Sequence, residues 1–407
     1  MDQQNLTHPD VHPAPETAVA PPSATRRPAL GPPVVGMVGA GQLARMTAAA
    51  AIGLGVRFRV LAAAADDSAA QVCADAPVGD YRSADDLLAF AAGCDVVTFD
   101  HEHVPEPALH ALEAAGRVVW PPSAALRLTQ DKLAMRRRLG DLGVPVPWAA
   151  PVASQADAEA IADRTDWPVV LKAVSGGYDG RGVWVCRSYA EIAEVMAHGI
   201  PVLVEELVPF ERELAVLVAR SPSGHGAAYP VVQTIQRDGI CHEVLAPAPD
   251  LADDVAADAI QLGLLLAREL DVIGLLAVEL FETPGGLLVN ELAMRPHNSG
   301  HWTIEGSRTS QFEQHLRAVL NLPLGSPTLT APCVALANVL GADDPDLQGK
   351  LGHVLAADPA LKIQLYGKPV RPGRKVGHVT ALGDDMTSAR DRATRAARYL
   401  ATGSEEP

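Results

Sequence analysis

The alternation of apolar and polar positions changes character along the chain. Residues 34–61 read as an apolar strand, a glycine turn, a helix and a second apolar strand, and residues 95–99 supply another strand. This order is typical of an α/β unit with a parallel sheet. From about 150 to 325, strands, hairpin turns and helices alternate, which indicates an α+β region. The strands expected there are 169–174, 183–186, 202–206 and 214–219.

Proline, glycine and charge mark the boundaries between these regions. A charged helix at 130–142 ends at Gly143, and after residue 323 short strands and glycine turns continue to about residue 382, before a helix at 388–400. The segments expected are a disordered Pro-rich tail (1–33), an N-terminal α/β domain (34–130), a central module (131–325), a small β-rich domain (326–385) and a C-terminal helix and tail (386–407).

Composition narrows the class of protein. A chain of 407 residues exceeds the usual single core, so two or three domains are expected, and no apolar run reaches the roughly 20 residues of a membrane span. The five cysteines lack the CxxC spacing of zinc or redox sites, which favours isolated thiols in a reducing cytoplasm. A net charge of -16 argues against nucleic-acid or anionic-membrane partners, because those need a broad basic face.

The first candidate for chemistry is Lys172 and the loop that follows it. Four glycines stand among the eight residues 175–182, between two apolar strands, and such a backbone can bring its amides close to phosphate oxygens while Lys172 neutralises them. The alternative is an ordinary hairpin, since Asp179-Gly180 is a turn signal by itself. The loop is not a Walker A motif, because no Gly-Lys-Ser/Thr precedes a helix.

The second candidate is a hairpin with one carboxylate on each strand. Glu279 and Glu291 lie equally far from Gly285, so antiparallel pairing sets them opposite each other or within one residue of that position. Facing carboxylates repel, and a hard cation such as Mg²⁺ removes the repulsion while also binding substrate phosphates. Asn290 adds a neutral oxygen. The alternative is an exposed strand edge with ordinary acids.

Two further stretches carry positive or aromatic polar groups. Residues 295–302, the substrate loop, contain His297 and His301 four positions apart. Proline and glycine in this loop make a zinc-binding helix unfavourable. Arg295 is better suited to binding an anion. The basic segment, residues 368–378, is the densest cluster of cations in an acidic chain. It indicates either a preformed phosphate or carboxylate site or a solvated basic loop.

The N-terminal glycines form a weaker signal. Residues 39–44 match the dinucleotide fingerprint GxGxxA in a strand, turn and helix context, yet Leu61 is followed by four alanines where an acid for the ribose is expected. We interpret the turn as an anion site at a helix N-terminus.

With these residues considered, the sequence resembles the ATP-grasp superfamily and, within it, the N5-carboxyaminoimidazole ribonucleotide synthetases. The resemblance covers residues 34 to about 382 and is carried, in family order, by GAGQLARM, KAVSGGYDGRG, VNELAMRPHNSGHW, SQFEQHLRA and KPVRPGRKVGH. It implies a pre-ATP-grasp domain of Rossmann-like α/β type, an ATP-grasp module of two subdomains, a small C-terminal domain and a homodimer.

The resemblance also implies roles for individual residues on the nucleotide side. The triphosphate contacts correspond to Arg127, Lys172, Gly177, Tyr178, Asp179, Gly180, Arg181 and Gly182. The adenosine contacts correspond to Glu205, Glu206, Leu207, Val208 and Glu213, with Gln236 standing where many relatives have a histidine. The magnesium ligands correspond to Glu279, Asn290 and Glu291.

Roles on the side of the second substrate follow in the same way. The ribonucleotide contacts correspond to Gly41, Gln42, Leu43, Glu102, His297, Asn298, Ser299, Lys368, Arg374 and Lys375. Residues implied in catalysis are Tyr178, Asp179, Arg181, Arg295 and Lys368. The segment 99–103 is rearranged relative to the family pattern, so that Asp100 or Glu102 could take the aminoimidazole.

The implied activity is carboxylation of 5-aminoimidazole ribonucleotide with bicarbonate, in purine biosynthesis, at the expense of ATP and with Mg²⁺. Bicarbonate would take the γ-phosphoryl group to give carboxyphosphate, under the glycine loop as a lid. Three alternatives remain open from sequence: a formate-dependent glycinamide ribonucleotide transformylase, which shares the ATP-grasp core, an NAD-dependent oxidoreductase, which rests on the N-terminal glycines, and a non-catalytic nucleotide sensor.

Overall fold

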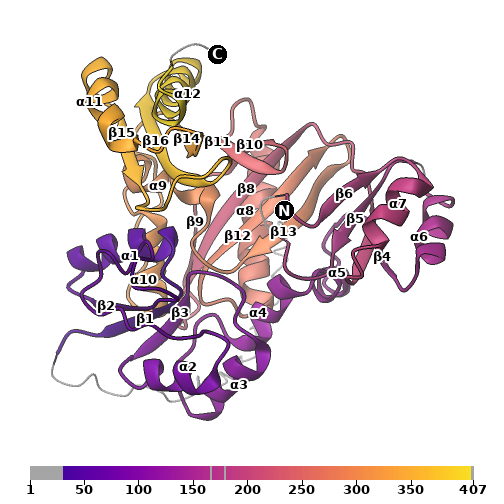
Figure 1. Ribbon diagram of the computed structural model, residues 1–407, viewed down its shortest axis with the longest axis horizontal. Helices are drawn as coiled ribbons and strands as arrows, with labels where there is room; N and C mark the ends of the chain where they lie inside the picture. The colour runs from indigo at the N-terminus through magenta and orange to yellow at the C-terminus, as the bar shows by residue number, and fades with distance from the viewer. Residues whose placement is uncertain (1–30, 166, 178–179, 405–407) are drawn as a thin grey trace, which may run out of the picture. The chain divides into compact units, whose positions relative to one another are not determined.

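The structure is a computed structural model that describes residues 31–165, 167–177 and 180–404 (Figure 1). Nearly all of the predicted Pro-rich tail lies outside these residues, as do Tyr178 and Asp179 of the glycine loop. Within the described ranges, no helix is long and apolar enough to cross a membrane.

The N-terminal region is a three-stranded parallel sheet in the order β2-β1-β3, with helices connecting its strands. The predicted succession of strand, glycine turn, helix and strand is confirmed, and Gly39 has the positive φ of +97° that the turn after β1 requires. The elements are β1 (Val34–Val38), α1 (Gln42–Gly53), β2 (Arg57–Leu61), α2 (Ala84–Ala91), β3 (Val96–Phe99), α3 (Glu106–Ala114) and α4 (Ser123–Gln130).

The charged helix expected at 130–142 is confirmed as α5 (Lys132–Asp141), and its start lies two residues later than expected because Gln130 belongs to α4. The chain turns out of helical geometry at Asp131, which ends α4 and begins α5, where its side chain accepts a hydrogen bond from the amide of Ala134. Aspartate is among the best N-cap residues, so a new helix starts there. This break directs Lys132 and Arg136 toward the next sheets.

A second, four-stranded antiparallel sheet has the order β4-β7-β5-β6 and buries one face against α6 and α7. Ile161 and Ile192 from these helices pack on Val169 and Leu171. The elements are α5 (Lys132–Asp141), β4 (Ala149–Val152), α6 (Gln155–Ala162), β5 (Val169–Ala173), β6 (Val183–Cys186), α7 (Tyr189–Met196) and β7 (Val202–Glu206).

The third sheet is the largest, with nine antiparallel strands in the order β13-β12-β8-β10-β11-β14-β16-β15 and β9 beside β8. Alternate residues of β8 and β12 point to opposite faces: Val216 and Leu276 join the core beneath α8, whereas Leu217 packs near Trp302. The elements are β8 (Arg212–Arg220), β9 (Gly226–Ala228), β10 (Val232–Arg237), β11 (Ile240–Ala246), α8 (Asp253–Glu269), β12 (Gly274–Thr283), β13 (Gly286–Ala293), η1 (Asn298–Gly300), α9 (Thr303–Gly306), α10 (Gln311–Val319), β14 (Cys333–Leu340), α11 (Leu347–Ala357), β15 (Lys362–Leu365), β16 (Lys375–Gly383) and α12 (Met386–Thr402).

The C-terminal strands continue this large sheet. β14 pairs with β11 from Glu243↔Ala337 to Ala246↔Val334, so the short strands expected after residue 323 share a hydrogen-bonded sheet with the central module. α12 packs on β14 and β16, and its Leu400 lies in the same core as Val379. The boundary expected at 385/386 therefore falls between a helix and the strands that it covers.

Deletion of residues 386–407 is expected to destabilise the protein strongly. Loss of α12 uncovers the core around Val379 and removes Leu400, and one buried leucine alone stabilises a fold by about 2–5 kcal/mol. Urea unfolding followed by circular dichroism measures the effect. A matched deletion of 404–407 keeps α12 and its C-cap Gly403, whose φ is 74°, and should unfold like the full chain. Equal midpoints for both deletions would contradict this account.

Candidate active site

The β12–β13 hairpin holds the two predicted carboxylates opposite each other. Glu279 pairs in register with Glu291, and a bulge follows directly after Glu279. Partial burial and the facing Glu291 raise the pKa of Glu279. The Nε2 of His297 lies 3.4 Å from a Glu279 oxygen, and the Nζ of Lys132 lies 2.9 Å from a Glu291 oxygen. The predicted facing arrangement is confirmed, and it concentrates negative charge at one point of the sheet.

This arrangement fits a hard divalent cation. Two carboxylates that crowd each other gain from a shared positive charge, and Mg²⁺ characteristically takes one or two protein carboxylates and completes its shell with phosphate oxygens and water. The side-chain oxygen of Asn290 lies beside them and accepts a hydrogen bond of 3.1 Å from Lys172. Among the described residues, no group of three or more His, Cys, Asp or Glu side chains forms a complete metal cage. A site of this composition suits an ion brought in with a nucleotide.

A buried ionic network joins the second sheet to the hairpin. Glu205 at the end of β7 is 2.7 Å from Lys172 and 2.8 Å from Arg136, and all three side chains are almost fully buried. Arg136 also donates to the backbone oxygens of Val289 and Asn290, at 3.3 and 2.8 Å. The network therefore holds Lys172 directly beside the carboxylate pair.

Burial acts differently on the two ends of this network. Burial lowers the pKa of Lys172, although Glu205 opposes the shift. Burial alone would raise the pKa of Glu205, but Lys172 and Arg136 together hold it below its usual value. The resemblance places Glu205 in the segment that reads adenine through its backbone; in the structure, its side chain lies 2.7 Å from Lys172 and holds that lysine in place.

Lys132 and Arg136 are site residues that the sequence reading missed. They stand four apart on α5 and therefore share a face of the helix, directed at Glu291 and Glu205 respectively. The spacing of two cations in 132–136 was the available signal. This spacing alone does not predict a role for either cation, because only the fold shows which carboxylates face that side of the helix.

The glycine loop between β5 and β6 closely approaches the turn between β10 and β11. A Cβ on Gly180 would lie 2.8 Å from the backbone oxygen of Asp238 and 2.9 Å from the Cα of Gly239. Gly180 and Gly182 have positive φ values of 75° and 77°, which favour glycine. Glycine at 180 is thus required both by conformation and by contact with the turn that follows Gln236 and Arg237.

The remaining residues predicted for the nucleotide lie on strands around this region. Glu213 on β8 pairs with Thr234 on one side and Phe281 on the other, and burial raises its pKa to about 7. Leu207 is exposed and Val208 is buried just after β7, beside Glu206, whose carboxylate accepts a hydrogen bond from the Trp148 amide. Gln236 follows a bulge in β10, and Arg127 lies in the last turn of α4.

Two acids at the end of β3 have separate partners. Asp100 accepts hydrogen bonds from the amides of Gly41 and Ala44, at 2.6 and 2.8 Å, and so places its carboxylate at the N-terminus of α1. The anion site that we expected at this helix terminus is therefore engaged by a carboxylate of the protein itself. Glu102 accepts from the amide of Met294 at 2.8 Å and lies 3.4 Å from Arg295. Glu102 thus ties β3 to the start of the substrate loop.

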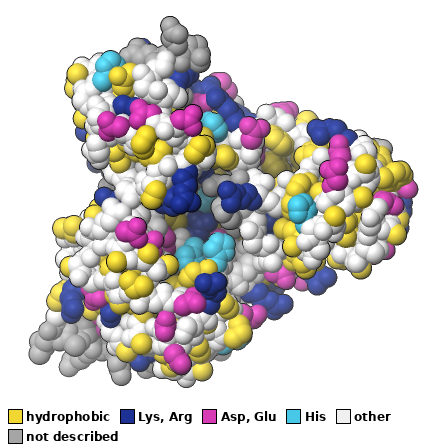
Figure 2. Space-filling model, in the orientation of Figure 1, with side chains coloured by type: hydrophobic (Ala, Val, Ile, Leu, Met, Phe, Trp, Pro, Cys, Tyr) yellow, Lys and Arg dark blue, Asp and Glu magenta, His cyan; other side chains and the backbone are white. Residues whose placement is uncertain are grey.

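The basic segment lies across from these acids. Lys368 hydrogen-bonds the side chain of Gln42, which brings together two residues predicted for one substrate phosphate. Arg374 donates to the Pro369 oxygen at 3.3 Å, and Lys375 is close enough to lower the pKa of Glu279 by its charge. Figure 2 shows Lys, Arg and His side chains gathered around a hollow near the middle of the molecule.

The substrate loop between them is largely buried. Burial lowers the pKa of His297 to about 3, and its Nδ1 lies 2.9 Å from the Ser299 hydroxyl. The Nδ1 of His301 instead faces Gln311 at 3.0 Å. The two histidines therefore have different partners, which disfavours the zinc alternative. Both amide atoms of Asn298 are buried without a hydrogen-bond partner among the described residues.

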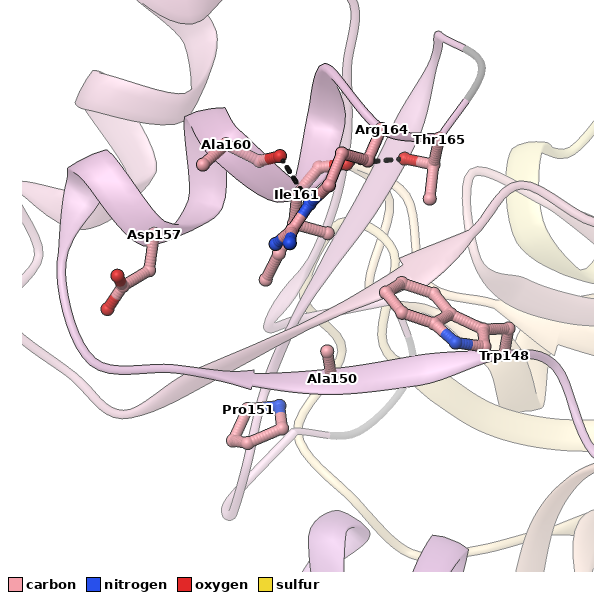
Figure 3. Close-up of a pocket in the computed structure, with 8 residues that line it drawn as sticks. All are labelled: Trp148, Ala150, Pro151, Asp157, Ala160, Ile161, Arg164 and Thr165. Carbon is pink, nitrogen blue, oxygen red and sulfur yellow. Dashed lines mark hydrogen bonds between the residues drawn. The ribbon is translucent and has the colours of Figure 1, made fainter.

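A separate surface groove of about 710 Å³ lies between β4 and α6 (Figure 3). Trp148 and Ala150 form one wall, and Ile161 and Arg164 form the other. None of the residues that line it belongs to the predicted site. The groove plays no part in the chemistry discussed below.

Comparison with known proteins places this geometry in a family. Residues 33–130 match the ribonucleotide synthetase preATP-grasp domain, residues 137–312 the ATP-grasp domain, and residues 334–392 the phosphoribosylaminoimidazole carboxylase C-terminal domain. The chain is 55% identical over 379 residues to the N5-carboxyaminoimidazole ribonucleotide synthase of Mycobacterium tuberculosis, covering 91% of this chain and 88% of that protein. The chain belongs to the N5-carboxyaminoimidazole ribonucleotide synthase family.

Other members of the N5-carboxyaminoimidazole ribonucleotide synthase family agree with this assignment. The synthase of Corynebacterium ammoniagenes is 49% identical, over 91% of this chain and 92% of that protein. The crystal structure of the Thermus thermophilus synthetase has a TM-score of 0.81 and 38% identity, covering 90% of this chain and 98% of that one. The Aspergillus clavatus synthase, solved in complex with ADP and 5-aminoimidazole ribonucleotide, has a TM-score of 0.84 and 30% identity, covering 91% and 99%. The predicted ATP-grasp fold, with its N-terminal and C-terminal domains, is confirmed.

Glu205→Gln is expected to lower the free energy of unfolding at neutral pH by about 3–5 kcal/mol, because it leaves Lys172 and Arg136 buried without a counter-charge. The pKa of Glu205 is depressed in the folded state, so its contribution is present above the ordinary glutamate pKa of about 4.3 and is lost as pH falls through the folded value. Between pH 7 and pH 3, the free energy of unfolding of the variant should therefore fall by less than that of the wild type.

The control is Glu206→Gln, because the neighbouring Glu206 is exposed and its partner is the Trp148 amide. Urea titrations between pH 3 and pH 7 give the comparison. Similar small losses for both variants would contradict the importance of the buried network.

Proposed function

We propose that this chain is an ATP-dependent ligase that joins bicarbonate to the exocyclic amine of 5-aminoimidazole ribonucleotide, giving N5-carboxyaminoimidazole ribonucleotide, ADP and phosphate in purine biosynthesis. The observation that carries the proposal is the β12–β13 carboxylate pair, with Lys132 beside Glu291 and Lys172 beside Asn290. Lys375 and Arg295 are close enough to Glu279 to lower its pKa by their charge. The synthases named above, to which the chain is similar over most of its length, are consistent with it.

The first step is phosphoryl transfer. A bicarbonate oxygen attacks the γ-phosphorus, the bond to the β-phosphate oxygen breaks, and ADP leaves as carboxyphosphate forms. Lys172 and Arg295 spread the charge on the transferring oxygens. Glu279, Asn290 and Glu291 would hold Mg²⁺, which when bound neutralises charge on the phosphates.

The second step forms the carbon–nitrogen bond. The amine nitrogen of the ribonucleotide attacks the carboxyphosphate carbon, or the CO₂ released from it, the bond from carbon to the phosphate oxygen breaks, and the amine loses a proton. Water would destroy the intermediate, so exclusion of solvent and close positioning matter more than a strong base. The approach of Gly180 to the β10–β11 turn supports the role of the glycine loop as a lid.

Site residues on the nucleotide side follow from this mechanism. We assign the triphosphate to Arg127, Lys172, Gly177, Tyr178, Asp179, Gly180, Arg181 and Gly182, and adenosine to Glu205, Glu206, Leu207, Val208, Glu213 and Gln236. Glu213 is close enough to the carboxylate pair to raise the pKa of Glu279, and its own burial supports a role as a hydrogen-bond partner of the ribose hydroxyls.

The ribonucleotide would occupy the opposite side of the carboxylate pair. We assign it to Gly41, Gln42, Leu43, Glu102, His297, Asn298, Ser299, Lys368, Arg374 and Lys375, with Tyr178, Asp179, Arg181, Arg295 and Lys368 acting in catalysis. The contact between Gln42 and Lys368 supports one phosphate site built from both ends of the chain. A homodimer and a cytoplasmic location are part of the same proposal.

Purified protein is expected to release ADP only when bicarbonate and 5-aminoimidazole ribonucleotide are both present, because each is needed to complete the sequence of bond changes. A coupled assay for ADP, with each substrate omitted in turn, is the measurement. ADP formation with formate and glycinamide ribonucleotide, but not with bicarbonate, would favour the transformylase alternative.

Glu291→Gln is expected to lower kcat by at least about 100-fold while the protein stays folded, because an amide cannot replace the charge that binds the cation and stabilises the transferring phosphoryl group. The matched control is Glu282→Gln on the same hairpin, since Glu282 pairs with Arg212. That control should retain the dependence of ADP release on magnesium. Near-normal kcat for Glu291→Gln would remove the metal assignment.

A further inference from the structure

A buried polar cluster lies between the substrate loop and the basic segment, and the proposed chemistry leaves it unused. His301, Tyr366 and His378 are each 0–1% exposed. The ring centroids of the two histidines are 5.3 Å apart, with an angle of 32° between the planes. A cluster of this kind at the junction of two substrate-binding segments requires an account of its hydrogen bonds.

The proton of His301 can be located from its neighbours. The side-chain oxygen of Gln311 accepts from the His297 amide at 2.9 Å, and its nitrogen donates to the His297 oxygen at 2.8 Å. The same Gln311 nitrogen lies 3.0 Å from Nδ1 of His301. Because an amide nitrogen only donates, Nδ1 of His301 accepts, and the neutral ring carries its proton on Nε2. Burial keeps the ring neutral by lowering its pKa well below the usual value.

The same reasoning applies to His378. The Tyr366 hydroxyl lies 2.7 Å from Nδ1 of His378, and burial raises the pKa of Tyr366, so the phenol keeps its proton. Among the described residues, Nδ1 of His378 is the only acceptor within hydrogen-bond distance of this buried hydroxyl, so the phenol donates its proton there and the neutral His378 ring carries its own proton on Nε2. Burial lowers the pKa of His378 to about 3, so this ring also stays neutral.

Two buried N–H donors therefore lack a partner. The Nε2 atoms of His301 and His378 have no hydrogen-bond partner among the described residues, and neither does the amide of Asn298 in the same loop. A buried water typically makes about three hydrogen bonds to otherwise unpaired polar groups. The two ring N–H groups supply two of these hydrogen bonds.

We propose that His301 and His378 share one buried water, and that this water fixes the substrate loop against the basic segment. The inference rests on the proposed function, in which the loop carries Arg295 and Asn298 and the basic segment carries Lys368. His301 and His378 are positioning residues, because they act on the ribonucleotide through the segments that they join.

The contacts of Tyr366 show how the water would affect the position of Lys368. The N-terminal domain holds the backbone of this segment, since Ser68 donates to the Tyr366 oxygen at 2.5 Å and Gln71 donates to the Gly367 oxygen at 2.7 Å. The Tyr366 side chain points into the core, where the His378 ring is the only hydrogen-bond partner of its hydroxyl among the described residues. Lys368, two residues further on, lies 5.9 Å from the Tyr366 ring. Loss of the link at His378 therefore releases one support of the Tyr366 side chain, which lies beside this cation.

A double-mutant cycle on the full-length protein tests the shared water. His301→Phe and His378→Phe should each raise KM for 5-aminoimidazole ribonucleotide by about 10-fold, through loss of positioning, and leave KM for ATP within about twofold. The double variant should also show an increase of about 10-fold rather than about 100-fold, because both single changes remove the same water.

His315→Phe is the matched control. His315 is a third fully buried, neutral histidine, but both of its ring nitrogens are paired, with the Thr98 hydroxyl at 2.8 Å and the Leu275 amide at 3.2 Å. Its replacement should lower stability without changing the KM ratio of the two substrates. A similar rise in KM for the ribonucleotide in this control would overturn a specific role for the His301 and His378 pair.

A wild-type crystal structure that resolves ordered waters gives a test independent of variant folding. One water within hydrogen-bond distance of both Nε2 atoms is expected, and its absence would overturn the inference, as would multiplicative effects in the double variant or unchanged KM values in the single variants. Failure of the wild type to release ADP with both substrates would instead count against the proposed function.

Discussion

Electrostatic repulsion between Glu279 and Glu291 is the constraint around which the site is organised. Strand pairing forces these carboxylates together, and partial burial of Glu279 weakens the screening by bulk water at that carboxylate. Cations from other elements approach both, among them Lys132 from α5 and Lys375 from β16. The protein alone leaves this charge incompletely balanced, so the hairpin is prepared to bind a further positive ion together with the phosphates that accompany it.

Three acids that are buried or half-buried, on β7, β8 and β12, show how local partners decide protonation. Glu205 has two buried cations within hydrogen-bond distance, and its pKa falls. Glu213 has burial as its only resolved influence, and its pKa rises to about 7. Glu279 is desolvated and also faces another carboxylate, and its pKa rises as well. The same residue type therefore orders a lysine, offers a neutral or charged hydrogen-bond partner, or binds a cation, according to what lies within a few ångströms.

The parts of the site that could be predicted from sequence are those set by local geometry. The facing of Glu279 and Glu291 followed from their equal distance to a glycine turn, and the turn after β1 followed from its glycines. The role of Arg136 could not be predicted, because its partner Glu205 lies 69 residues away. The contact of Asp100 with the N-terminus of α1 was missed for the same reason, since Asp100 follows Gly41 by 59 positions and no local pattern shows their contact.

The continuous large sheet has a consequence for the exchange of modules between related ligases. Its C-terminal strands carry the basic segment, and they are joined to the nucleotide-binding strands by the backbone ladder between β11 and β14. A C-terminal module transplanted from a relative would have to reproduce that ladder residue for residue, because a slip of one position turns every side chain to the other face. Exchange of C-terminal modules between β11 and β14 is thus limited to relatives whose strands pair in the same register. The two proposed substrate sites are therefore expected to be inherited together.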